Sequence, residues 1–237
     1  MTVRELKRSQ SAPEMAVVAP PPLENGDRLT RWEFERRYEA MPDNRKAELI
    51  EGVVYMASPV SMIHARPHSH ILAWLGVYCG ATPGVDIADN VTVRLDAENE
   101  VQPDALLRME RSGHSAVGAD SYVQGSPELI VEIAVSSAAY DLHDKLKVYR
   151  RNGVQEYIVW QVYDKRVDWF ELQDGEYLPL ARDEESGAHK SKVFPGLYLS
   201  AKALLEGDLA GVLAELQKGL ASPEHEQFAR RLKEKQA

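Results

Sequence analysis

The chain has 237 residues, 44% of them hydrophobic, which is enough for one good-sized domain with appendages around a hydrophobic core. Its apolar runs are shorter than the roughly 20 residues that cross a bilayer, and no signal-peptide centre is visible, so we expect a cytoplasmic protein without a membrane span. The net charge of −9 argues against nonspecific coating of nucleic acid, and the single Cys79 excludes an internal disulfide and a cysteine-rich zinc site.

The first half of the chain begins with residues 1–27, which contain Ser-, Pro- and Gly-rich stretches and are expected to form a flexible tail. Thr30-Arg31-Trp32-Glu33 matches a capping box and predicts a helix to about Ala40. Periodicity and turn residues then predict a strand over residues 48–57, bent at Glu51-Gly52, and a helix over 62–79. Two strands are expected next, over 85–95 and 101–109, followed by a polar loop over 110–126.

The second half contains a long apolar strand followed by a helix that ends at Gly153. These two elements and three strands joined by tight turns are expected over residues 128–135, 141–152, 156–162, 166–172 and 176–180. Helices are expected from Ala201 and from Ser222-Pro223. The order predicts an α/β fold with a mixed central β-sheet flanked by helices, with residues 28–200 as the domain and 201–237 as a C-terminal helical extension.

One charged residue interrupts the apolar strand, namely Glu132 in Leu129-Ile130-Val131-Glu132-Ile133-Ala134-Val135. A buried carboxylate is normally paired or bound to a metal. Strand alternation places Glu132 on one face with Ile130 and Ala134, and the small Ala134 leaves room beside the carboxylate. The best candidate partners are Asp104 and Lys145.

Lys145 lies on the predicted helix that follows this strand. Leu142, Leu146 and Tyr149 form the apolar stripe of that helix, and Lys145 is one turn from two of them, so it lies along the same buried side. Asp141 precedes it by four residues, a spacing that allows a salt bridge. Two interpretations remain open, because the amine can reach inward to Glu132 or along apolar surface to water.

Asp104 stands in Gln102-Pro103-Asp104, where the proline suits the start or edge of a strand. The same pair of residues also occurs in ordinary Pro-Asp turns. Two carboxylates, from Asp104 and Glu132, together with a lysine suit a magnesium ion that also binds substrate phosphate. Such an ion generates a nucleophilic water and stabilises charge on phosphoryl oxygens, while the lysine orients the water or neutralises the transition state.

Five segments of the chain form a recognisable ordered set, namely Glu48-Leu49-Ile50-Glu51-Gly52, Gln102-Pro103-Asp104, Val131-Glu132-Ile133, the spaced Asp141, Lys145 and Tyr149, and Gly153-Val154-Gln155-Glu156-Tyr157. Over roughly residues 30–200 this set resembles the Uma-two family of restriction-endonuclease-like proteins, within the PD-(D/E)XK nuclease superfamily.

The resemblance implies a restriction-endonuclease-like fold, dependence on Mg²⁺ (or Mn²⁺) and phosphodiester hydrolysis. It implies Asp104 and Glu132 as metal ligands, with the main-chain carbonyl of Ile133 as a third. Ala134 occupies the usual lysine position, so the catalytic lysine would be Lys145, moved from the strand to the next helix. Two further residues fall on recurrent family positions and are expected to support the site, namely Glu48 and His64.

The expected function is a magnesium- or manganese-dependent DNA endonuclease, with RNA as a substrate left open. A homodimer is expected, because cutting two strands suits two sites related by a two-fold axis. One alternative is a catalytically inactive interaction module that binds a partner through its C-terminal helices. Another is a zinc-dependent hydrolase, because His64 and His68 are spaced by four and His70 is near, although the glutamate of the zincin motif is absent.

Overall fold

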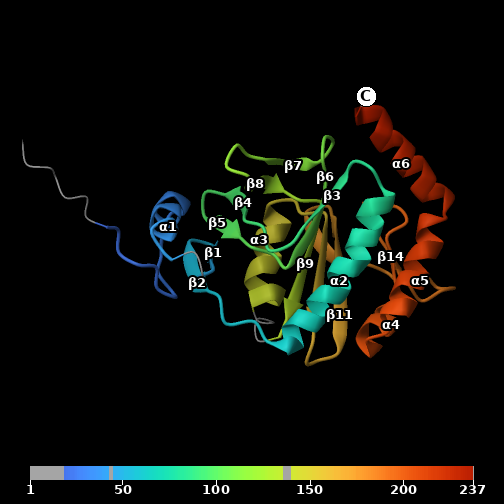
Figure 1. Cartoon of the computed structure of the whole chain (residues 1–237), viewed down its shortest axis with the longest axis horizontal. Coiled ribbons are helices and arrows are strands. Elements are labelled where there is room, and N and C mark those ends of the chain that lie inside the picture. The colour runs from blue at the N-terminus through green and yellow to red at the C-terminus, as the bar shows by residue number, and fades with distance from the viewer. Residues whose placement is uncertain (1–18, 43–44, 136–139, 237) are drawn as a thin grey trace, which may run out of the picture.

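A computed structural model describes residues 19–42, 45–135 and 140–236 of the chain. Within them, a six-stranded central sheet crosses the middle of the molecule (Figure 1). The strands of this central sheet are, in spatial order, β12 (Glu176–Pro179), β11 (Arg166–Gln173), β10 (Glu156–Gln161), β9 (Leu129–Ala134), β6 (Ala105–Met109) and β3 (Val85–Ala88). The pair β9–β10 is parallel and its other pairs are antiparallel, so the predicted mixed sheet is present.

A second six-stranded sheet, which the sequence patterns did not predict, lies on the N-terminal side of the molecule (Figure 1). Its strands are, in spatial order, β2 (Val53–Met56), β1 (Ala47–Ile50), β5 (Asn99–Val101), β4 (Val93–Asp96), β8 (Val123–Ser126) and β7 (His114–Val117). Strands β1 and β2 form a hairpin whose turn is Glu51-Gly52, as expected.

The helices surround these sheets, and a short hairpin of β13 (His189–Lys190) and β14 (Tyr198–Leu199) precedes the last three. A π-helical turn, η1 (Tyr140–Asp144), leads directly into α3. The helices are α1 (Arg31–Tyr38), α2 (Met62–Ala81), α3 (Lys145–Arg151), α4 (Ala201–Glu206), α5 (Leu209–Leu220) and α6 (Pro223–Gln236). None of the helices in the described part of the chain combines the length and hydropathy that crossing a bilayer requires.

The two faces of β9 enter different hydrophobic clusters, as the alternation predicts. Val131 and Ile133 pack in a cluster with α2 and the C-terminal helices, whereas Ile130 and Ala134 pack in another cluster with α3. Glu132 shares the α3 face. Because β9, α3 and the parallel strand β10 follow one another in the chain, α3 crosses the sheet on that side, and this connection brings Glu132 close to the helix.

The C-terminal helices share the core of the central sheet. Leu204, Val212 and Phe228 are buried in the same cluster as Val131, and α5 contacts α2 (Figure 1). The hydrophobic core therefore continues across the boundary expected at residue 200. That residues 201–237 form a separate extension stays a prediction.

The expected N-terminal tail is only partly covered by the structure, because residues 1–18 lie outside the described residues. Leu23 is buried in a cluster with Phe34 and Val54, and the N–H of Gly26 donates to the carbonyl of Val54 at 2.8 Å. The packed part of the chain therefore begins before residue 28.

Three expectations about strands were wrong. The strand expected over 85–95 is divided at Asn90, whose φ of 52° lies in the left-handed region that asparagine tolerates. The strand expected over 101–109 is divided at Gln102-Pro103-Asp104, because proline has no N–H for a sheet ladder. The loop expected over 110–126 contains the hairpin β7–β8. At Asn90 and at Pro103 the chain crosses from one sheet to the other. The crossing at Pro103 places Asp104 at the junction of the two sheets.

Candidate active site

A cavity of about 690 Å³ lies where the second sheet, the start of α2, the end of β9 and α3 meet. Strands β1 and β9, the junction before β6, and helices α2 and α3 each contribute side chains to its wall. The residues expected from the sequence to form the site all line it, namely Glu48, His64, Asp104, Glu132, Ile133 and Lys145.

Lys145 points inward and lies at the centre of an acidic cluster. Its amine lies 2.9 Å from Oε1 of Glu132 and 3.0 Å from Oε2 of Glu48, and its side chain is 7% exposed. Oδ1 of Asp141, one helical turn earlier, lies 3.9 Å from the same amine. The hydroxyl of Tyr149 also donates to Oε1 of Glu132, at 2.8 Å. Of the two interpretations of Lys145, the structure shows the inward one.

The cluster shifts the protonation of its members in defined directions. Burial is the largest cause that raises the pKa of Glu132 well above its ordinary value, Lys145 opposes the shift, and the surrounding carboxylates add to it. Burial also disfavours charge on Lys145, but Glu132 and Glu48 outweigh it and hold the pKa of the amine well above its ordinary value. The raised pKa therefore keeps the Lys145 amine protonated and positively charged among the acidic groups.

Glu48 joins the second sheet to this cluster. It lies on β1, and its Oε1 accepts the backbone N–H of Gln102 at 2.7 Å while its Oε2 pairs with Lys145. The carboxylate therefore holds the β5–β6 junction on one side and the α3 lysine on the other.

Asp104 is held by two groups on opposite elements. Its Oδ2 accepts the backbone N–H of Ile133 at 2.7 Å, and its Oδ1 lies 3.1 Å from Nε2 of His64. Burial alone would raise the pKa of Asp104, but the hydrogen bonds from His64 and Ile133 leave it below its ordinary value. The contact with Asp104 correspondingly raises the pKa of His64.

Pro103 explains why the end of β9 is open on this side. The antiparallel register sets Ala105 opposite Val131 and, continued by two residues, would set Pro103 opposite Ile133. Proline has no N–H, so it cannot donate to the carbonyl of Ile133, and the N–H of Ile133 turns to the Asp104 carboxylate instead. The main-chain carbonyl of Ile133, which is the expected third metal ligand, therefore accepts no hydrogen bond from Pro103.

His68 was not among the residues expected in the nuclease site, and the sequence offered it only for the alternative zinc site. It lies one turn after His64 on α2, and its Nε2 is 2.7 Å from the main-chain oxygen of Asp104 and 3.1 Å from Oδ1 of Asp89. Its spacing of four from His64 was visible in the sequence, but the aspartate that the two histidines share was not. Among the described residues, one group of three has side-chain ligand atoms within 4.8 Å of one another, namely His64, His68 and Asp104.

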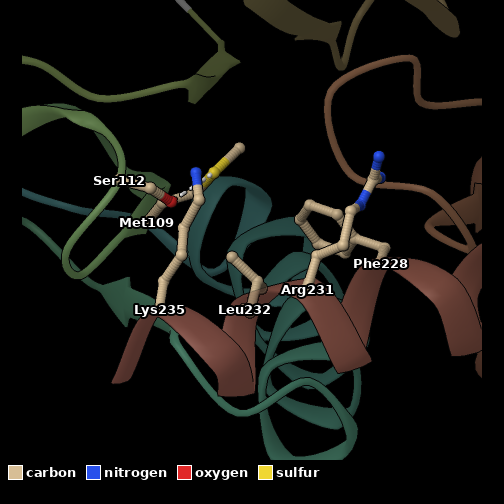
Figure 2. Close-up of a pocket in the computed structure, with 6 residues that line it drawn as sticks. All are labelled: Met109, Ser112, Phe228, Arg231, Leu232 and Lys235. Carbon is tan, nitrogen blue, oxygen red and sulfur yellow. Dashed lines mark hydrogen bonds between the residues drawn. The ribbon is translucent and has the colours of Figure 1, made fainter. Parts of the chain in front are cut away.

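A second, smaller cavity of about 170 Å³ lies away from these groups, between α6 and the end of β6 (Figure 2). Figure 2 shows the side chains of Phe228, Arg231, Leu232 and Lys235 projecting from α6, with Met109 and Ser112 next to Lys235. Its wall contains two basic side chains but no carboxylate or histidine to act with them, so the larger cavity is the candidate active site.

A protein-family model described as "Putative restriction endonuclease" matches residues 8–202. The chain belongs to the Uma2 family. The resemblance seen in the sequence motifs is thereby confirmed, and every residue expected in the site lies within the matched range.

A solved structure supports the fold of this Uma2 protein. The chain is similar to the crystal structure of "a putative nuclease belonging to DUF820" from Anabaena variabilis ATCC 29413, with 14% sequence identity and a TM-score of 0.56. The match covers 72% of this chain and 96% of that one. At this identity the likeness shows the fold, and it confirms the expected restriction-endonuclease-like α/β class. A search of the curated proteins found no match of significance.

Proposed function

We propose that this Uma2 protein is a divalent-metal-dependent endonuclease that hydrolyses phosphodiester bonds of DNA. The observation that carries the proposal is the convergence of Asp104, Glu132 and Lys145 on one cavity, from a strand junction, a strand and a helix. Two carboxylates beside a charged lysine are the groups that metal-assisted phosphate chemistry requires. We further propose a cytoplasmic homodimer that cuts both strands with sites related by a two-fold axis.

The donor atoms fit Mg²⁺ (or Mn²⁺). Asp104, Glu132 and the carbonyl of Ile133 supply oxygen ligands, and magnesium is usually held by one or two carboxylates with water and phosphate completing its shell. Pro103 leaves the Ile133 carbonyl without a ladder donor, which suits it to this role. When bound, the ion would lower the pKa of a water and stabilise charge on the phosphoryl oxygens.

The charge of the cavity also supports a cation. Lys46 and Lys145 are the lysines of its wall. Five carboxylate residues line the same wall, namely Glu48, Asp89, Asp104, Glu132 and Asp141. A phosphodiester is itself an anion, so this acidic excess must be offset before the substrate can enter, and a divalent cation offsets it.

Lys145 has the remaining role in the chemistry. Its amine already lies between Glu132 and Glu48, and its raised pKa keeps it protonated, so it can donate hydrogen bonds but not act as a base. We assign it to stabilising the charge that develops on the scissile phosphate. Glu48 and Tyr149 position it, because Glu48 binds the amine directly and the Tyr149 hydroxyl donates to the Glu132 oxygen that the amine also contacts.

The test is cleavage of supercoiled plasmid, linear DNA and RNA with Mg²⁺, with Mn²⁺ and with a chelator, by the wild type and Asp104→Ala. The proposal expects metal-dependent cleavage that the variant loses while its circular dichroism stays that of the wild type. Cleavage that survives in the variant would mean contamination or another site. No cleavage of any substrate would favour the alternative interaction module, and cleavage supported by zinc alone would favour the zinc hydrolase.

A further inference from the structure

We propose that His64, His68 and Asp104 bind a second class of cation, a borderline transition-metal ion such as Zn²⁺ or Co²⁺. The side-chain ligand atoms of these three residues all lie within 4.8 Å of one another, a separation that one ion can bridge after small rotamer shifts. The site is distinct from the oxygen ligands of the proposed magnesium ion, although it shares Asp104 with them.

The backbone already holds the two histidines in a suitable arrangement. They are separated by four residues on α2, so their rings lie on one face of the helix, with ring centroids 5.7 Å apart. Both Nε2 atoms are directed at the same residue. That of His64 lies 3.1 Å from Oδ1 of Asp104, and that of His68 lies 2.7 Å from its main-chain oxygen.

The helix is a rigid support for these ligands. Ile71, Trp74 and Leu75 of α2 are fully buried against the central sheet, and the two rings and the one carboxylate of the proposed site are partly buried. Ordering the ligands therefore costs little conformational entropy when an ion binds, because packing has already fixed the backbone that carries them.

The chemistry of the donors selects the ion. Imidazole nitrogen suits zinc, copper, iron and nickel, whereas magnesium prefers carboxylate, carbonyl and water oxygens. Two histidines and one carboxylate leave positions open on the ion for water or a substrate group. Asp89 could supply a fourth ligand, because its Oδ1 lies 3.1 Å from Nε2 of His68.

The test is a titration of the metal-free, full-length protein with Co²⁺ in buffer containing excess Mg²⁺, followed by visible absorption of the bound cobalt. We expect about one Co²⁺ per chain and displacement of the cobalt by Zn²⁺. His64→Ala and His68→Ala should each weaken binding at least about tenfold. His70→Ala is the matched control, because His70 lies on the same helix but outside the three-residue group, and it should bind like the wild type.

Several outcomes would overturn the inference. They are no cobalt binding by the wild type, binding that survives in both histidine variants, or equal loss in His70→Ala. Circular dichroism of each variant separates loss of a ligand from loss of the fold. Cobalt binding does not require cleavage, so Mg²⁺-dependent cleavage without cobalt binding would remove this inference alone, and cobalt binding without any cleavage would remove the proposed function alone.

Discussion

Replacing Lys145 by methionine tests whether the ion pair with Glu132 is buried and strong. The substitution keeps the length of the apolar stem and removes the amine that lies 2.9 Å from Glu132 and 3.0 Å from Glu48. Removing one partner of a buried pair typically costs about 3–5 kcal/mol, because the other charge is left uncompensated. The Glu132 side chain is 5% exposed and stays buried, whereas Glu48 is more exposed and can regain water. We therefore expect a loss of about 3 kcal/mol in the free energy of unfolding.

The loss should depend on pH in a definite direction. Without Lys145, the pKa of Glu132 in the folded state rises further above its value in the unfolded chain, so folding takes up a proton. Stability is then lost as pH rises through the interval between those two pKa values. The difference between Lys145→Met and the wild type should accordingly be smaller near pH 5 than near pH 7.

The assay is urea unfolding followed by tryptophan fluorescence at both pH values. Lys147→Met is the matched control, because Lys147 lies on the same helix and is exposed, and its effect should stay within about 0.5 kcal/mol. Glu132→Gln combined with Lys145→Met should recover part of the loss, because the buried charge is then gone. An effect of Lys145→Met no larger than that of the control would refute the buried ion pair.

Three further predictions concern groups around the site and the core. Burial raises the pKa of Glu156 to about 7, above the 4.5 expected for a free side chain, so the stability of the wild type relative to Glu156→Gln should fall as pH rises from about 4.5 to 7 by on the order of 3 kcal/mol, measured by urea unfolding. Tyr149→Phe removes the hydroxyl that donates to Glu132 at 2.8 Å and should cost about 1–3 kcal/mol in the same assay. A Cβ on Gly219 would lie 2.1 Å from a backbone oxygen, so Gly219→Ala should lower the melting temperature, whereas Gly80→Ala, with open space, should not.

The elements that could be predicted from the sequence are those whose signal is local. Thr30 caps α1 as expected, and its hydroxyl accepts the N–H of Glu33. The apolar run of β9 and the tight turns of the following strands also fix their elements through short-range patterns. Two expected strands are each divided in the structure, one at Asn90 and one at Pro103, and each has apolar residues on both sides of its division. Only the pairing of the two parts in different sheets shows that the chain changes direction there.

The candidate site divides in the same way. Glu132 and Lys145 were predictable, because strand alternation and helix periodicity place each on a known face of neighbouring elements. The contacts of Tyr149 with Glu132 and of His68 with Asp104 depend on how α3 and α2 dock on the central sheet, and sequence periodicity carries no information on that docking.

The central claim is that Lys145 and the carboxylates beside it hydrolyse phosphodiester bonds, and one rate comparison tests it most directly. Mg²⁺-dependent cleavage of supercoiled plasmid is measured for the wild type, Lys145→Ala and Lys147→Ala, at a temperature where circular dichroism shows all three folded. Losing a group that stabilises transition-state charge typically lowers the rate by about 10²–10³-fold. We predict a loss of that size for Lys145→Ala and a wild-type rate for Lys147→Ala. Equal rates for the two variants would contradict the assignment.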